Sequence, residues 1–151
     1  MEVENTNSSQ DVYIAGIVQD SLVDGPGLRT TIFFSGCSVR CAHCHNAKYI
    51  ERDTGIKMSL HELVERIKRT CVTKKITISG GEPLEQPEGV LGLIAALPDY
   101  DIGLYTSYEL SDVDSDILKN LSFVKTGRFV KEQKITNEYF GSSNQKLILL
   151  R

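Results

Sequence analysis

Short β-rich segments alternate along this chain with helical patterns, and this alternation limits the fold more than any other feature of the sequence. The β-rich segments are residues 12–18, 30–35, 75–79, 102–106, 123–126 and 146–150. Several are continuous apolar or β-branched runs, which is typical of strands buried on both faces. Strands that alternate with helices predict βαβ units, right-handed crossovers and a mostly parallel sheet.

Three helical patterns lie between these segments. Residues 59–70 begin with a capping box formed by Ser59 and Glu62. Residues 86–98 place Pro87 near the helix start and Pro98 after the last apolar position, which predicts where this helix begins and ends. A third apolar stripe predicts a helix over residues 110–121. The units are too few for a closed eight-stranded barrel, so we expect an α/β fold, either an open partial barrel or a short sheet.

Composition and charge argue against several classes of function. The chain has 151 residues, 40% hydrophobic and 25% charged, which suits one domain with a single core. The net charge is -3 and no basic run occurs, which disfavours nucleic-acid binding. The longest apolar stretch, residues 90–97, is too short for a bilayer, and residues 1–10 lack a signal-peptide core. We therefore expect a flexible tail over residues 1–10, one domain over residues 11–151, and a cytoplasmic location.

Three unusual segments follow three of the predicted strands. They are "SGC" at residues 35–37, "SGGEP" at residues 79–83 and "YTSY" at residues 105–108. Ligands of parallel α/β sheets bind at the C-terminal ends of the strands, so these segments are expected to meet at one edge, which we call the rim. Their convergence is a stronger indication of a site than any one motif.

Three cysteines near the rim have the spacing C-x3-C-x2-C: Cys37, Cys41 and Cys44. A cubane iron–sulfur cluster normally takes four thiolates, so three would leave one iron open for a small molecule. A structural zinc site built from these cysteines with His43 or His45 is the alternative reading. Cys71 follows an amphipathic helix away from the rim and is expected to be an inert core thiol. His61, in the first turn of that helix, is expected at the surface.

The glycine-rich turn after residues 75–79 is the second candidate for ligand binding. Gly80 and Gly81 permit a positive φ and a close backbone approach. Glu82 adds a carboxylate that either fixes the turn or receives an amine. The turn lacks the G-x4-G-K-[ST] pattern of a phosphate loop. The segment "DGPGLRT", residues 24–30, is interpreted as a type II turn, and Asp24 and Arg29 as structural residues.

Together these motifs resemble the radical S-adenosylmethionine (AdoMet) superfamily. The opening "DGPGLRTTIFFSGCSVRCAHCHN" is similar to that of enzymes which activate glycyl-radical enzymes. "YTSYEL", "GRFVKE" and "GSSNQKL" narrow the resemblance to the activating proteins of anaerobic ribonucleoside-triphosphate reductases. The resemblance covers nearly the whole chain after the tail. It departs at Thr126, where many members have Asp, and at Ser107, where Gly is common.

The resemblance implies an open partial (β/α) barrel of the radical SAM type with two cofactors, a [4Fe-4S] cluster and AdoMet. The cluster ligands would be Cys37, Cys41 and Cys44. The residues lining AdoMet would be His43, Cys44, His45, Gly80, Gly81 and Glu82, with Thr106 a weaker candidate. The implied activity is reductive cleavage of AdoMet and abstraction of a hydrogen from a glycine of the reductase, which leaves a glycyl radical. No protein acid, base or nucleophile is required, because the cofactors carry the chemistry.

The resemblance also implies two partners, which are the reductase itself, presenting a glycine loop, and an electron donor such as flavodoxin or ferredoxin. Two other functions stay open at this stage. One is another radical AdoMet activity, either an activase of a different glycyl-radical enzyme or a small-molecule synthase. The other is a zinc-binding interaction module without catalysis.

Overall fold

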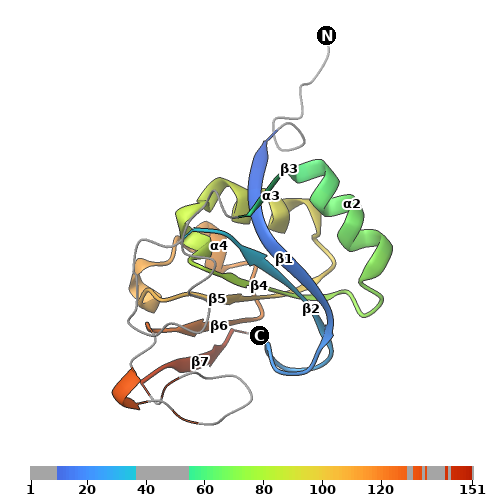
Figure 1. Ribbon diagram of the computed structural model, residues 1–151. Coiled ribbons are helices and arrows are strands. Elements are labelled where there is room, and N and C mark those ends of the chain that lie inside the picture. The colour runs from blue at the N-terminus through green and yellow to red at the C-terminus, as the bar shows by residue number, and fades with distance from the viewer. Residues whose placement is uncertain are drawn as a thin grey trace.

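The computed structural model describes residues 10–36, 55–128, 131–133, 135, 142 and 144–150. Its centre is a seven-stranded sheet with the order β3-β1-β2-β4-β5-β6-β7 (Figure 1). The strands are β1 (Asp11–Ser21), β2 (Arg29–Phe34), β3 (Ile56–Ser59), β4 (Lys75–Gly80), β5 (Asp101–Tyr105), β6 (Phe123–Thr126) and β7 (Lys146–Leu149). The helices are α2 (Leu60–Thr70), α3 (Pro87–Ala96) and α4 (Ser115–Leu118), with 3-10 turns η3 (Pro83–Glu85), η4 (Leu110–Asp112) and η5 (Lys131–Gln133).

The sheet is parallel at its centre and antiparallel toward its edges. β2, β4, β5 and β6 pair in parallel, whereas β1 pairs antiparallel with both β2 and β3, and β7 pairs antiparallel with β6. The edge strands β3 and β7 do not pair with each other, so the sheet is open. The predicted α/β class and the open partial barrel are confirmed. The antiparallel pairing of the edge strands was not predicted.

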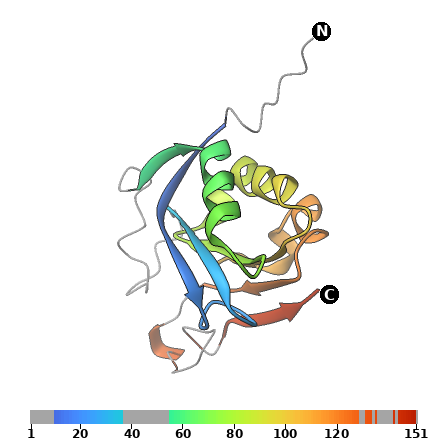
Figure 2. The same ribbon diagram turned by 90° about the vertical axis from the view of Figure 1, so that its right-hand side faces the viewer.

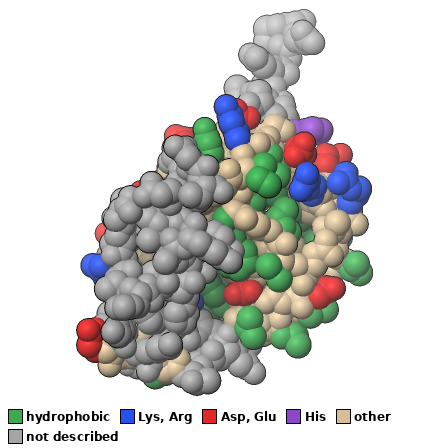
Figure 3. All heavy atoms as spheres, viewed as in Figure 1, with side chains coloured by type: hydrophobic (Ala, Val, Ile, Leu, Met, Phe, Trp, Pro, Cys, Tyr) green, Lys and Arg blue, Asp and Glu red, His purple; other side chains and the backbone are tan. Residues whose placement is uncertain are grey.

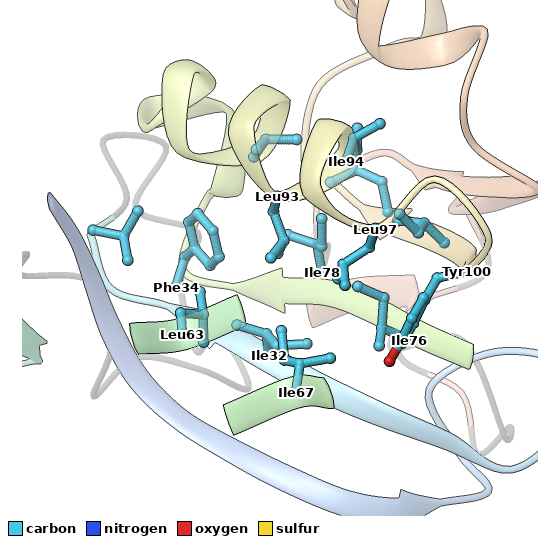
Figure 4. Packing of buried hydrophobic residues seen from close by; sticks show 14 of the residues in the cluster. Ile32, Phe34, Leu63, Ile67, Ile76, Ile78, Leu93, Ile94, Leu97 and Tyr100 are labelled. Carbon is cyan, nitrogen blue, oxygen red and sulfur yellow. The ribbon is translucent and has the colours of Figure 1, made fainter. Parts of the chain in front are cut away.

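The α-helices lie together on one side of the sheet (Figure 2). Ile32 and Phe34 of β2 and Ile76 and Ile78 of β4 point toward them and are fully buried (Figure 4). The helical residues in the same cluster include Leu63, Ile67, Leu93 and Ile94. Alternate strand residues therefore point to the opposite side, where none of the described α-helices lies. We call it the helix-free face and define it by Thr31, Phe33, Thr77, Ser79, Tyr105, Phe123 and Lys125.

Helix α2 begins where the capping box predicts. The Ser59 hydroxyl accepts a hydrogen bond from the Glu62 backbone N–H at 3.1 Å. The outer side of the helix carries charges of both signs, including the pair Arg66–Glu62 at 3.7 Å (Figure 3). His61 is exposed, as predicted. The apolar stripe of the helix is buried, so local capping and the amphipathic pattern agree here.

The apolar stripe over residues 110–121 does not form one helix, and that prediction is wrong. Leu110 is 36% exposed, whereas the other stripe residues, Val113, Ile117 and Leu121, are buried. The Asp114 carboxylate accepts a hydrogen bond from the Asp116 N–H at 2.7 Å and starts the short helix α4. A separate capping box, formed by Glu109 and Asp112, begins η4. Acidic caps therefore divide a segment whose apolar spacing alone predicts a continuous helix.

Strand β3 was not predicted from the sequence. It is four residues long, and Met58 is its buried hydrophobic residue, whereas Ile56 is 64% exposed. It pairs with β1, in the register Val12 opposite Met58. Its existence depends on this pairing with a distant segment rather than on a local pattern. Among the described residues, no helix is long and apolar enough to cross a membrane.

Arg29 joins β2, β4 and β5 near the start of these strands. Its Nε donates to Thr77 Oγ1 at 2.9 Å, and its Nη1 donates to the Pro26 carbonyl at 2.7 Å. Its Nη2 donates to the Ile76 carbonyl at 2.9 Å and to the Asp101 carboxylate at 2.6 Å. The side chain is buried, so these acceptors replace water around the guanidinium. The structural role predicted for Arg29 is confirmed.

The loop between β1 and β2 folds against the helix-free face. Asp24 accepts hydrogen bonds from the hydroxyls of Ser21 at 2.6 Å and Thr31 at 2.9 Å. Thr77 Oγ1 donates to the Asp24 carbonyl at 2.5 Å. Gly27 has φ +84°, as the third position of a type II turn requires. The loop therefore covers the lower part of this face, away from the rim.

The first prediction concerns Arg29. Arg29→Lys should lower the free energy of unfolding by at least about 2 kcal/mol, because one ammonium cannot replace a fork that reaches four residues. Urea unfolding monitored by circular dichroism measures this change. Arg66→Lys is the matched control, since Arg66 is half-exposed and its ion pair is long, and it should change stability by less than about 0.5 kcal/mol. Equal stability of the two variants would contradict the role of Arg29.

Candidate functional site

The C-terminal ends of β2 and β4 are joined at the rim by backbone hydrogen bonds. The Gly81 N–H donates to the Phe34 carbonyl at 2.9 Å, and the Glu82 N–H donates to the Gly36 carbonyl at 2.7 Å. Gly36 has φ +95°. The chain that leads from β2 toward Cys37 is thus fixed to the glycine-rich turn. This arrangement confirms that two of the three predicted rim segments meet.

Gly80 is required for this close approach. Its φ is +125°, which L side chains rarely adopt. A Cβ at this position would overlap the backbone nitrogen and oxygen of Phe34. The glycine therefore lets β2 and the turn after β4 come into direct contact.

Glu82 connects the same turn to the segment after β5. Its carboxylate is fully buried. Oε2 accepts from the Thr106 hydroxyl at 2.8 Å and from the Leu84 N–H at 3.0 Å. Oε1 accepts from the Ser107 N–H at 2.7 Å. The third rim segment therefore joins the other two through one carboxylate.

Burial raises the pKa of Glu82 above its ordinary value, and the hydrogen bonds from Ser107, Leu84 and Thr106 oppose that rise. These donors occupy both carboxylate oxygens. The structure shows the first of the two roles predicted for Glu82, fixing the turn, and the second, receiving an amine, stays a prediction.

Gln86 ties β1 and β2 together beside the turn. Its Nε2 donates to the carbonyls of Tyr13 and Ser35, both at 3.0 Å, and its Oε1 accepts from the Tyr13 N–H at 3.0 Å. The Ser35 hydroxyl is buried and has no hydrogen-bond partner among the described residues. Ser35 lies two positions before Cys37. Its hydroxyl lies so close to Gly55 that a Cβ added to this glycine would overlap it. A buried donor without an acceptor fits a site that receives an acceptor-bearing group.

The end of β6 is fixed to the rim and to the C-terminal part of the chain. The Thr106 N–H donates to the Lys125 carbonyl at 2.9 Å, and the Gly127 N–H donates to the Tyr108 carbonyl at 3.2 Å. Gln145 Nε2 donates to the Gly127 carbonyl at 3.0 Å. The rim therefore extends across β2, β4, β5 and β6. The sequence offered no reason to assign a function to residues 141–145, of which Gln145 supports this edge.

The predicted cluster and zinc ligands Cys37, Cys41, Cys44, His43 and His45 lie outside the described residues. The remaining candidates Gly80, Gly81, Glu82 and Thr106 come together at the rim. Cys71 is buried, and its Sγ donates to the Lys75 carbonyl at 3.4 Å, which confirms the prediction of a core thiol. Within the described ranges, no group of three or more metal-ligating side chains could hold a metal ion.

Sequence reasoning missed Ser35, Gln86 and Lys125. In the sequence, Gln86 looks like any polar residue at the start of a helix. Its hydrogen bonds to Tyr13 and Ser35 join segments that are far away in the sequence. Lys125 occupies a strand position where a lysine ordinarily faces solvent. In the structure, burial lowers its pKa to about 8. No local pattern could have identified these residues.

Comparisons with known proteins place this chain among iron–sulfur proteins. Residues 23–148 match the family described as "4Fe-4S single cluster domain". The anaerobic ribonucleoside-triphosphate reductase-activating protein of Vibrio cholerae is 30% identical over 82% of this chain and 89% of its own length. The protein of the same name from Enterobacteria phage T4 is 28% identical over 83% of this chain and 86% of its own.

Two further similarities are more limited. The pyruvate formate-lyase-activating enzyme of Clostridium pasteurianum is 32% identical over 74% of this chain, but the match spans 50% of that enzyme. The crystal structure of QueE from Escherichia coli superimposes with a TM-score of 0.57 at 20% identity, covering 74% of this chain and 68% of the other. This structural similarity supports the fold alone.

The second prediction concerns the charge on Glu82. Glu82→Gln should lower the free energy of unfolding by about 1–3 kcal/mol, because the amide NH2 must face the N–H of either Leu84 or Ser107 and leaves one donor unpaired. Thermal or urea unfolding measures the loss. Glu65→Gln, on the exposed side of α2, is the control and should stay within about 0.5 kcal/mol. A neutral Glu82→Gln would show that these hydrogen bonds do not maintain the rim.

The third prediction compares two glycines. Gly80→Ala should destabilise the protein by about 1–3 kcal/mol from backbone strain, and overlap with Phe34 adds to that loss. Gly16→Ala is the matched strand substitution, since a Cβ there meets nothing within 4 Å, and it should be neutral or slightly stabilising. Denaturant unfolding of both variants tests the difference. Similar midpoints for the two would mean that β2 and the turn can separate without cost.

Proposed function

The chain belongs to the 4Fe-4S single cluster domain family and, within it, to the anaerobic ribonucleoside-triphosphate reductase-activating proteins, and from this membership we propose its activity. It is a radical AdoMet oxidoreductase that generates the glycyl radical of an anaerobic ribonucleoside-triphosphate reductase. The observation that carries the proposal is the rim. There the chain entering the cysteine motif is fixed to the Gly80–Gly81–Glu82 turn by backbone hydrogen bonds.

We propose that Cys37, Cys41 and Cys44 hold the [4Fe-4S] cluster through three of its irons. Three thiolates suit a cluster with one iron left for AdoMet. The described residues beside this motif fit such a group, because the buried Ser35 hydroxyl has no hydrogen-bond partner among them. When bound, the cluster and AdoMet supply one-electron cleavage and hydrogen abstraction, and the protein supplies binding and orientation.

The AdoMet site would lie along His43, Cys44 and His45 and over the turn after β4. Gly80 and Gly81 bring backbone rather than side chains to this edge. Since both carboxylate oxygens of Glu82 are occupied by protein donors, we assign Glu82 a positioning role in this site. It holds the turn and the Thr106–Ser107 segment in one arrangement beside the cofactor.

The partners follow from the same proposal. The macromolecular substrate is the reductase, presenting a glycine loop at the open edge. A domain with a single cluster needs its electrons from outside, which favours a donor such as flavodoxin or ferredoxin. We further propose one domain over residues 11–151 and a cytoplasmic location, and we assign no role in binding nucleic acid or membranes.

One observation supports an alternative substrate. The similarity to the pyruvate formate-lyase-activating enzyme of Clostridium pasteurianum makes another glycyl-radical enzyme the alternative target. The reductase is preferred, because its activating proteins match this chain over most of their own length. Presenting both target enzymes to the reduced activase and comparing their glycyl-radical yields separates the two.

The fourth prediction tests the cluster ligands. Anaerobically reconstituted, dithionite-reduced protein should give a low-temperature EPR signal that changes shape on adding AdoMet, followed by a glycyl-radical doublet on the reductase. Cys41→Ser should lose the cluster signal and the bound iron. Cys71→Ser is the matched control and should retain both, because Cys71 contacts the Lys75 carbonyl in the core.

Two results would contradict this proposal. Zinc in place of iron in the reconstituted wild type would support a structural metal site. A Cys41→Ser variant that keeps the full cluster signal would remove this cysteine from the ligand set.

A further inference from the structure

The last three backbone carbonyls before Cys37 are all bonded to one short segment, residues 81–86. The carbonyls are those of Phe34, Ser35 and Gly36, and the donors are, in the same order, the Gly81 N–H, the Gln86 side-chain amide and the Glu82 N–H, at 2.9, 3.0 and 2.7 Å. Two of these donors are backbone N–H groups, which nearly every residue type supplies. The third is a side chain, so Gln86 is the donor that the amino-acid sequence specifies.

The Gln86 amide also takes the place of a hydrogen bond between β1 and β2. The last pair of their register before the rim is Ile14 and Phe34. The next residues to face each other are Tyr13 and Ser35, and a hydrogen-bonded antiparallel pair exchanges two bonds. The Ser35 N–H donates to the Tyr13 carbonyl at 2.9 Å, but the Tyr13 N–H donates to Gln86 Oε1 at 3.0 Å. The amide is thus inserted between the strands at the point where β2 ends.

This position of the Gln86 side chain is not explained by the helix that it precedes. Gln86 is the N-cap residue of α3, and N-cap side chains ordinarily accept bonds from N–H groups of the first turn. Within the described helix, no N–H of that turn bonds to the Gln86 side chain. The residue is 9% exposed, so the strand carbonyls and the Tyr13 N–H replace water around its amide. Its side chain therefore serves the strand ends rather than α3.

The backbone before Cys37 contains a residue whose freedom has to be limited from outside. Gly36 has φ +95°, and glycine has the widest conformational freedom of all residues. Rotation at Ser35 or Gly36 would displace Cys37 and everything that follows it. The bonds to the carbonyls of Ser35 and Gly36 restrict this rotation. Residues that orient a metal ligand in this indirect way affect how firmly the metal is held.

We propose that Gln86 is a positioning residue for the [4Fe-4S] cluster, because it fixes the Ser35 carbonyl and with it the backbone that enters Cys37. The inference rests on the proposed function, in which Cys37 is a cluster ligand. Gln86 acts through the end of β2 and takes no part in bond breaking. Since the same segment begins at the glycine-rich turn, the cluster ligand and the proposed AdoMet turn share one support.

The fifth prediction compares Gln86→Met with Gln145→Met. Gln86→Met keeps the length of the side chain but loses its N–H donor, so Cys37 should be held less firmly. Iron should then leave the reconstituted protein about tenfold faster, or more, in the presence of a ferrous-iron chelator. The absorbance of the iron–chelator complex, followed anaerobically, gives the rate.

Gln145→Met is the matched control for this measurement. The Gln145 amide also joins two backbone groups, since it accepts from the Ser142 N–H and donates to the Gly127 carbonyl, but it does so at the β6 side of the rim. Its variant loses the same chemical group at a distance from the chain that enters Cys37. Iron release from Gln145→Met should stay within about threefold of the wild-type rate.

The EPR signal of the reduced cluster adds a readout that lower stability alone would not change. In Gln86→Met, its shape should differ from that of wild type before AdoMet is added, because one ligand is held differently. Arg29→Lys destabilises the opposite ends of the same strands and should keep the wild-type shape. Unfolding midpoints show which variants are folded.

Gln86→Glu is the second variant, and it is decisive if Gln86→Met does not fold. Its ionised carboxylate accepts from the Tyr13 N–H, as the amide does, but has no donor for the Ser35 carbonyl. The bond to β1 is therefore kept and the bond to the chain before Cys37 is lost. Gln86→Glu should show the same faster iron release and the same change of signal shape.

The other outcomes overturn the inference in distinguishable ways. Wild-type iron release and signal shape in a folded Gln86 variant would remove the positioning role and leave the proposed function intact. Equal changes in Gln145→Met or Arg29→Lys would assign the effect to a general loosening of the sheet. Wild-type protein that takes up no [4Fe-4S] cluster would contradict the proposed function itself, and this inference with it.

Discussion

The rim depends on a buried carboxylate held by donors from two separate loops. Glu82 joins the turn after β4 to Thr106 and Ser107 after β5, and its own N–H reaches the Gly36 carbonyl beyond β2. Removing a carboxylate from water is costly, and charge-assisted hydrogen bonds at 2.7–3.0 Å are the compensation. A shift in any of these loops would leave part of that cost uncompensated. The arrangement therefore favours one relative position of the three strand ends, which a site formed between them requires.

The opposite ends of the same strands are joined by a buried cation. Arg29 donates to carbonyls and to Asp101 near the start of β4 and β5, and its guanidinium stacks on Phe123. Burial alone raises the pKa of Asp101, but hydrogen bonds from Ser122 and Arg29 bring it below its ordinary value, so the pair stays charged above the acid range. The parallel strands are thus held at both ends by polar side chains, and by apolar packing against the helices between them.

The sequence predicts the parts of this protein that depend on local pattern. Runs of apolar or β-branched residues predicted β2, β4, β5 and β6, and a capping box predicted the start of α2. The prediction of one helix from Leu110 onward was wrong because acidic caps interrupt that segment. Strand β3 was not predicted because it forms through pairing with β1, which leaves no local pattern. For the site, spacing indicated the glycine turn, but two of the three partners of Glu82, Thr106 and Ser107, lie 24 and 25 residues away in the sequence. Tertiary contacts of this range have no local signal, and Lys125 was missed for the same reason.

The described polar groups also bear on how the chemistry is divided. The Glu82 carboxylate accepts three hydrogen bonds, one of them from the Thr106 hydroxyl, and the Gln86 amide bonds to β1 and to Ser35 after β2. These rim residues therefore stabilise the scaffold rather than transfer protons. A site that leaves the reaction to bound cofactors needs rigidity at its edge more than it needs an acid or base. Its selectivity must then come from the surface that receives the polypeptide.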